Sequence, residues 1–309
     1  MKTELKVILS LVFVLLLGEA GSRAFESRLS ADVRQMLAFE EIPQEIAEAQ
    51  AAGQTCVLVL GNSLARAAVD SETLEIGLIE KGWPQPKVFY LAPDGSGVNE
   101  WTTAYRKHFP SSKTIRPDLL ILVTGPGHLL DHSVRSPEKL SAFLAAPQDR
   151  GEIFRDWLTT DSERCRFVLA GVSRLFANRD RVRPLMFYNL VPGYEVTAQR
   201  LNRAGREGRE ESVPAVATAN RFRTLLDSLD LPADRVILAG APLPESYRLP
   251  EAVLKATSEW GIAVFDDSAA AEWPSEAFPD GYHMGPSAAG VFTDELLQAT
   301  FQFEPGVIR

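Results

Sequence analysis

The chain has 309 residues, of which 45% are hydrophobic and 24% are charged, and its formal net charge is −9. This is the composition of an ordinary soluble globular protein, long enough to bury a large core in one domain or to form two small ones. The negative charge argues against nucleic acid as the main partner, because proteins that bind nucleic acid usually present a basic face.

The first 24 residues have the pattern of a targeting segment. Lys2 and Lys6 precede an apolar run over residues 7–17, which has the length of the hydrophobic region of a signal peptide. Small residues at 18–20 and 22–24 offer cleavage sites. The alternative is an uncleaved anchor, although this run is short for a bilayer that needs about 20 residues. We therefore predict an exported protein, which is periplasmic, extracellular or anchored to the outer face of the cytoplasmic membrane through its N-terminus.

Residues 27–50 carry apolar side chains at helical spacing, which predicts a helix broken near Pro43. Strand-like and helix-like segments then alternate. The predicted strands are 56–60, 87–91, 118–124, 166–170, 235–239 and 262–265, and the predicted helices are 64–78, 98–109, 251–260 and 286–301. Such alternation implies a parallel sheet covered on both faces. We predict a three-layer α/β/α fold, with a mainly parallel sheet of five to six strands, for a domain over residues 25–309.

Residues 174–223 interrupt this alternation with ten arginines against five acidic residues. One interpretation is an insertion that forms part of the substrate rim, because binding specificity often resides in such connections. The other is a solvated surface helix with a flexible loop. Cys56 and Cys165 both lie in strand-like runs, and we expect them to be small buried core residues, with a disulfide as the alternative in an exported protein.

A possible nucleophile follows the first predicted strand, in the sequence Gly61-Asn62-Ser63. A serine in this position needs an imidazole to take its proton and a carboxylate to orient that imidazole. Asp280 and His283 offer both from one short loop near the C-terminus, and the order Ser…Asp…His is compatible with a catalytic triad. The alternative is a strand-to-helix turn in which Asn62 or Ser63 caps the helix.

Three candidate residues, Ser63, Gly97 and His128, each follow the end of a predicted strand. Ligands of parallel sheets bind beyond the carboxyl ends of the strands. We therefore expect these residues to gather at one edge of the sheet.

The two segments that carry Ser63 and His283 resemble the SGNH hydrolase family, the GDSL-type esterases and acyltransferases, over about residues 55–297. The family's first block is a strand followed by Gly-Asp-Ser. Its last block is Asp-x-x-His, and the run Met284–Gly290 is similar to the start of the helix that follows it there. The resemblance implies Ser63 as the nucleophile, His283 as the general base and Asp280 as the carboxylate that orients it.

The resemblance also implies an oxyanion hole built from the serine amide, a glycine amide and an asparagine side chain. Gly97 is the best match for the glycine and Gly95 is the second choice. The block that usually reads Gly-x-Asn-Asp is Gly125-Pro-Gly-His128 here, so its asparagine is missing. We predict that His128 replaces this donor, or that the hole has only two members.

These features predict a serine esterase that acts on O-acyl esters, in the first place acetyl esters, of a small molecule or carbohydrate. One alternative is a polysaccharide O-acetyltransferase with the same triad. Another is a non-catalytic binding or assembly protein of the cell envelope, which the missing asparagine favours. The sequence has no metal-ligand spacing, no phosphate-binding glycine loop and no nicotinamide or flavin fingerprint, so we predict neither a metal nor a cofactor.

Overall fold

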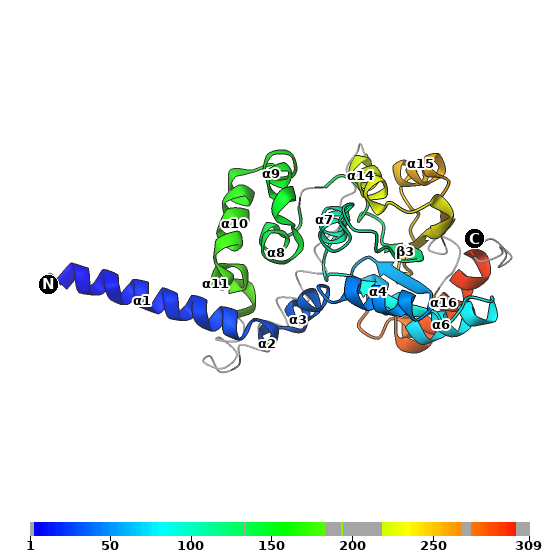
Figure 1. The fold of residues 1–309 in the computed structure, drawn as a ribbon, viewed down its shortest axis with the longest axis horizontal. Helices are drawn as coiled ribbons and strands as arrows, with labels where there is room; N and C mark the ends of the chain where they lie inside the picture. Colours follow the sequence, from blue (N-terminus) through cyan, green and yellow to red (C-terminus); the bar gives the residue numbers. More distant parts are fainter. Residues whose placement is uncertain (1–2, 133, 183–192, 194–217, 267–272, 301–309) are drawn as a thin grey trace. The chain divides into compact units, whose positions relative to one another are not determined.

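The computed structural model describes residues 3–132, 134–182, 193, 218–266 and 273–300, and the chain forms two compact units. The first unit comprises Met1–Ala38 and Ser136–Ser212, and the second comprises Phe39–Arg135 and Val213–Arg309. The second unit contains the sheet and the candidate site, whereas the described part of the first unit is helical (Figure 1).

The sheet of the second unit has five parallel strands in the order β2-β1-β3-β4-β5. The strands are β1 Cys56–Leu60, β2 Lys87–Leu91, β3 Leu119–Thr124, β4 Val236–Gly240 and β5 Ala263–Phe265. Every residue of β1, β3 and β4 is buried, which explains why these strands read as continuous apolar runs. The predicted α/β class with a parallel sheet is confirmed.

Helices cover both faces of this sheet. Val57 and Val59 of β1 belong to one core cluster with residues of α5, α6 and α16. Alternate residues of a strand face opposite sides, and on the opposite side the Cys56 Sγ lies 3.6 Å from the carbonyl oxygen of Ile46 in α4. The helices of this unit are α4 Ile42–Ala51, α5 Ser63–Ala68, α6 Ser71–Glu80, α7 Val98–His108, α14 Asn220–Leu229, α15 Glu251–Trp260 and α16 Pro286–Thr300. Figure 1 shows α7, α14 and α15 on one side of the sheet and α6 and α16 on the other.

Two predicted helices are divided in the structure. Residues 27–50 form α2 Glu26–Leu29, α3 Ala31–Ala38 and α4. The predicted break near Pro43 is present, because α3 ends at Ala38 and α4 begins at Ile42. Pro43 itself lies in the first turn of α4, where a missing N–H costs nothing. The predicted helix 64–78 is two helices, α5 and α6. Asp70 starts the second one by accepting a hydrogen bond from the Thr73 amide at 2.8 Å.

The first unit corrects one predicted strand. Residues 166–170 lie inside helix α10, Asp161–Val172. A capping box starts this helix, because Thr160 Oγ1 accepts from the Glu163 amide at 3.2 Å and the Glu163 carboxylate accepts from the Thr160 amide at 3.0 Å. Its buried residues, Phe167 and Ala170, are spaced as on one face of a helix. The other helices here are α1 Thr3–Ala24, α2, α3, α8 Pro137–Lys139, α9 Arg150–Glu152 and α11 Arg174–Ala177, with short η1 Leu140–Leu144, η2 Pro147–Asp149 and η3 Ile153–Trp157.

Charged pairs hold parts of the first unit together. Glu138 is 4% exposed and pairs with both Arg166 and Arg179, and Asp32 pairs with Arg181 at 2.5 Å. Much of the predicted arginine-rich insertion, residues 183–192 and 194–217, lies outside the described residues, and a role in the substrate rim stays a prediction.

Both cysteines are free. Cys56 is buried in β1 as predicted, but the prediction of burial is wrong for Cys165, because α10 leaves it exposed. At the N-terminus, α1 is long and apolar enough to cross a membrane, a test that signal sequences also pass. This is consistent with export.

Candidate active site

Ser63 lies where the chain turns from β1 into α5. Gly61 makes this turn possible, because a Cβ there would lie 2.6 Å from both the Val123 carbonyl oxygen and the Ala65 Cβ. Any side chain at position 61 would push β1 away from β3. The turn leaves Ser63 partly exposed as the first residue of α5.

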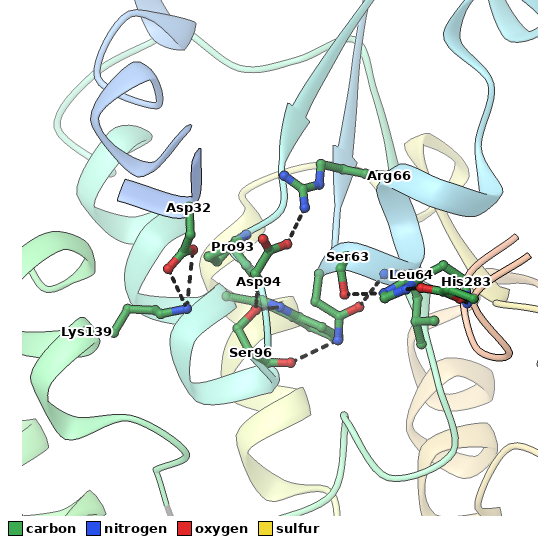
Figure 2. Close-up of polar contacts among 12 residues, drawn as sticks. Asp32, Ser63, Leu64, Arg66, Pro93, Asp94, Ser96, Lys139 and His283 are labelled. Atoms are coloured by element: carbon green, nitrogen blue, oxygen red, sulfur yellow. Dashed lines mark hydrogen bonds and ion pairs between the residues drawn. The ribbon is translucent and has the colours of Figure 1, made fainter. Parts of the chain in front are cut away.

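The structure brings Ser63, His283 and Asp280 together across more than two hundred residues of sequence. His283 Nε2 lies 3.0 Å from Ser63 Oγ (Figure 2). On the other side of the ring, His283 Nδ1 lies 2.7 Å from Asp280 Oδ2. With Nδ1–H donating to the carboxylate, Nε2 carries the lone pair that can accept the hydroxyl proton of Ser63. The three side chains are therefore arranged as nucleophile, base and orienting carboxylate.

The loop that carries Asp280 and His283 is stabilised by the carboxylate itself. Asp280 Oδ1 accepts the backbone N–H of Tyr282 at 2.9 Å and of His283 at 2.7 Å. Gly281 between them has φ +77°, a left-handed conformation that favours glycine. Burial acts to raise the pKa of Asp280, but the hydrogen bonds from His283 and Tyr282 outweigh it and lower the pKa to about 2. Asp280 is thus held ionised while it orients the imidazole.

Asn62 connects the turn after β1 to the loop after β2. Its side chain is 3% exposed; Oδ1 accepts the Leu64 amide at 2.9 Å, and Nδ2 donates to the Ser96 carbonyl oxygen at 3.0 Å. An aspartate could accept from Leu64 but could not donate to Ser96. This gives a physical reason for asparagine at the position where the family pattern has aspartate.

The buried side chain of His128 contacts the side chain of Asn62. Its imidazole is 5% exposed, its Nδ1 accepts the Gly125 amide at 3.0 Å, and both ring nitrogens lie 3.4 Å from Asn62 Nδ2. Burial, with a smaller contribution from Arg135, lowers the pKa of His128 to about 3. The ring is therefore neutral, and its polar contacts in the described structure are with Gly125 and Asn62, not with Ser63.

The two glycine candidates differ in their surroundings. Gly97 is buried at the start of α7, and its amide donates to the Glu100 carboxylate at 3.1 Å, so this N–H is already engaged. Gly95 is exposed, has φ +58°, and a Cβ there would have no neighbour within 4 Å. Of the two, Gly95 is the more accessible to a bound substrate.

Sequence reasoning missed a polar network under the site. Ser96 is completely buried; its hydroxyl accepts from Trp101 Nε1 at 2.8 Å and donates to the Pro93 carbonyl oxygen. The Trp101 ring meets the His128 ring edge to face, with centroids 6.0 Å apart. The only signal in the sequence is that these residues follow the ends of strands. The network holds the loops after β1, β2 and β3 together at one edge of the sheet.

A charged pair lies on the more exposed side of the same turns. Arg66, three residues after Ser63, pairs with Asp94 of the loop after β2, and both side chains are about one-third exposed (Figure 2). Among the residues that the structure describes, no group of three or more His, Cys, Asp or Glu side chains could hold a metal ion.

The chain matches no protein-family model and no curated protein. An assignment of function therefore depends on the residues and geometry described above.

Proposed function

We propose that this protein is a serine esterase of the SGNH hydrolase type, which acts on O-acyl esters through Ser63, His283 and Asp280. The observation that carries the proposal is the continuous series of contacts from Ser63 Oγ to His283 Nε2 and from His283 Nδ1 to Asp280, at 3.0 and 2.7 Å. A chance contact between a serine and a histidine would not be expected to include a carboxylate on the other ring nitrogen, as Asp280 is here.

The proposed reaction begins when Ser63 Oγ attacks the ester carbonyl carbon while its proton passes to His283 Nε2. The tetrahedral oxyanion collapses, and the alcohol leaves with the proton from His283, so that the acyl group remains as an ester on Ser63. A water molecule then gives a proton to His283 and attacks this ester. The second tetrahedral intermediate collapses, the bond to Ser63 Oγ breaks, His283 returns the proton to Ser63, and the carboxylic acid is released. The ionised Asp280 stabilises the imidazolium in both halves of the reaction.

The oxyanion needs donors that point toward the carbonyl oxygen of the substrate. The Ser63 and Gly95 amides are the proposed donors, because the Gly97 amide is paired with Glu100. His128 remains a candidate for a third, through Nε2–H, since its Nδ1 is occupied by Gly125.

An O-acetyltransferase is the second candidate, because it forms the same acyl-enzyme and differs only in using a carbohydrate hydroxyl instead of water. The apolar N-terminal helix, which could be a signal sequence or an anchor, favours a substrate among extracellular or cell-envelope acyl carbohydrates. A non-catalytic role as a binding or assembly protein predicts that the same groups would give no turnover.

One experiment separates these functions. Turnover of p-nitrophenyl acetate is measured with and without an oligosaccharide acceptor, for the unaltered protein, Ser63→Ala and Ser258→Ala, an exposed serine of α15. We expect hydrolysis that Ser63→Ala abolishes and Ser258→Ala preserves. Acetylated oligosaccharide as the main product identifies a transferase, and equal turnover in the unaltered protein and Ser63→Ala contradicts the proposal.

A further inference from the structure

The C-terminal end of helix α1 contacts helix α11 of the first unit, whose described part is helical. Glu19 Oε2 accepts the Ser173 hydroxyl at 2.8 Å and the Leu175 amide at 3.0 Å, and Glu19 Oε1 accepts the Arg174 amide at 2.9 Å. These donors lie at the beginning of α11, where backbone N–H groups have no partner within the helix. Signal cleavage at either sequence-predicted site would remove Glu19 and leave the three donors without it.

Neighbouring residues extend this contact. A Cβ at Gly18 would lie 3.0 Å from Leu175 Cδ2, so α1 approaches α11 closely at that position. Arg23 pairs with Glu19 at 2.7 Å and donates to the Val172 carbonyl oxygen at 3.3 Å, and Ser22 is 6% exposed. The segment that contains both candidate cleavage sites is therefore helical and held to α11 through Glu19, with Ser22 buried and with Ala20 and Ala24 exposed. A peptidase must engage an extended segment, so cleavage there would require this helix to unwind.

The preceding part of α1 is different. Its large apolar side chains from Leu5 to Leu17 are 45% to 63% exposed on all sides of the helix. A helix that is apolar all round is stable in a protein core or in a bilayer. The described residues supply no core around it, whereas Lys2 and Lys6 at its start match the positive charge found on the cytoplasmic side of membrane helices.

The length of this part constrains what surrounds it. Because Glu19 is bound to α11, the described part of α1 on the N-terminal side of this contact runs from Thr3 to Gly18, about 24 Å at 1.5 Å per residue. The hydrocarbon core of a bilayer is about 30 Å thick. A span shorter than the hydrocarbon core is accommodated by local thinning of the bilayer or by flanking residues that reach the interface, and either leaves the attached unit close to the membrane surface.

The surface of α10 next to the end of α1 is apolar, as expected for a surface that lies at the membrane. Val168, Leu169 and Val172 of α10 are 50%, 40% and 68% exposed, and Arg23 contacts Val172 directly. Their spacing places them on neighbouring positions of one helical surface. Apolar side chains beside a membrane helix can enter the interfacial layer.

We propose that α1 is retained in the mature protein as a membrane anchor, and that the exposed face of α10 rests in the interface of the same bilayer. The partner of both surfaces is lipid. In this arrangement the contact of Glu19 with α11 holds the first unit to its membrane anchor.

The direct test uses the full chain, expressed with a C-terminal tag in cells with an intact secretion pathway. The N-terminus is determined by mass spectrometry, and membranes are extracted with alkaline carbonate and then with detergent. We expect residues 7–17 to be present in the mature chain and the protein to leave the membrane only with detergent. A mature chain that begins after Ala20 or Ala24 and is recovered without detergent overturns the proposal.

A pair of variants tests the contact through Glu19. In the detergent-solubilised full chain, Glu19→Ala should make trypsin cleavage around α11 roughly fivefold faster, the effect of losing a typical helix cap. Glu4→Ala changes an exposed acidic residue of the same helix and should leave the rate unchanged. Equal rates for the two variants would show that Glu19 does not hold α1 to the unit.

The position of α10 is tested with an environment-sensitive thiol probe in a Cys165→Ser background. Attached at Val172→Cys, the probe should shift to the blue on reconstitution into vesicles of phosphatidylethanolamine and phosphatidylglycerol. At Ser162→Cys, exposed at the other end of α10, it should not shift. The same response at both positions would contradict contact of the α10 face with lipid.

Discussion

The triad and the loops beneath it differ in how their polar groups are paired. Ser63 and His283 are partly exposed, and Asp280 is exposed. The His283 imidazole links the three, because it contacts the Ser63 hydroxyl on one side and the Asp280 carboxylate on the other. Asn62, Ser96 and His128 are at most 5% exposed, and they pair with backbone groups of neighbouring loops. The triad is arranged to react with a substrate that enters from solvent. The buried residues are arranged to hold the triad in position. Substitutions in the triad should therefore remove activity without unfolding the protein, and substitutions in the buried group should mainly reduce stability.

The largest effect is expected for Ser63→Ala. Loss of a triad nucleophile reduces the turnover rate by roughly 10⁴–10⁶, because no other group can form the acyl-enzyme. Ester turnover measures the loss, and thermal unfolding should be close to that of the unaltered protein. A variant that loses activity only because it unfolds would place Ser63 with the buried group.

Asp280→Asn should have the next largest effect. The amide cannot hold His283 as the carboxylate does, and in serine proteases the equivalent change lowers kcat by about 10⁴. Steady-state kinetics should show the loss in kcat. Asp227→Asn, an exposed residue of α14, is the matched control, and similar kinetics for the two variants would remove Asp280 from the mechanism.

Asn62→Asp should reduce stability. It places a buried carboxylate against the Ser96 carbonyl oxygen and removes the hydrogen bond that Nδ2 makes there, which should cost about 1–3 kcal/mol in the free energy of unfolding. Denaturant unfolding measures this cost. A variant as stable as the original would mean that this bond does not hold the two loops together.

The smallest effect at any one pH near neutrality is on the pH dependence of stability, which becomes large only as the pH falls. Burial lowers the pKa of His128 to about 3 and that of His108 to about 4, from 6.5. Between about pH 4 and 6.5 the unfolded chain binds protons that the folded protein does not, so stability falls as pH falls, by about 1.4 kcal/mol per pH unit for each histidine.

In His128→Gln, the slope of the unfolding free energy against pH should lose the contribution of His128 and keep the contribution of His108. Unfolding free energies measured across the same pH range give the two slopes. An unchanged slope would show that His128 is not buried as a neutral group. If kcat also falls by about 10²–10³ while KM is unchanged, the imidazole contributes to the oxyanion hole as well.

The sheet could be predicted from sequence because its central strands are buried on both faces and read as uninterrupted apolar runs. The same property explains the error at residues 166–170. An apolar run of that length is compatible with strand or helix, and here the capping box at Thr160 and Glu163 decides for the helix. The break between α5 and α6 was missed because it depends on a single cap, Asp70.

In the candidate site, Ser63, Asp280 and His283 could be singled out because each lies in a short local pattern. The links among Asn62, Ser96 and Trp101 could not, since they depend on how three loops meet after the sheet has formed. For the same reason the resemblance alone could not distinguish the surroundings of Gly97 from those of Gly95. The buried Glu100 carboxylate that occupies the Gly97 amide is visible only in three dimensions.

The central claim is that Ser63 is an activated nucleophile, and covalent labelling tests it most directly. The intact protein is incubated with a fluorophosphonate, which reacts with serines whose hydroxyl is deprotonated by a neighbouring base, and the modified peptide is identified by mass spectrometry. We expect one adduct on Ser63, lost in Ser63→Ala and strongly reduced in His283→Ala. No adduct on Ser63 in the folded protein, or equal labelling of Ser63 when His283 is replaced, would contradict it.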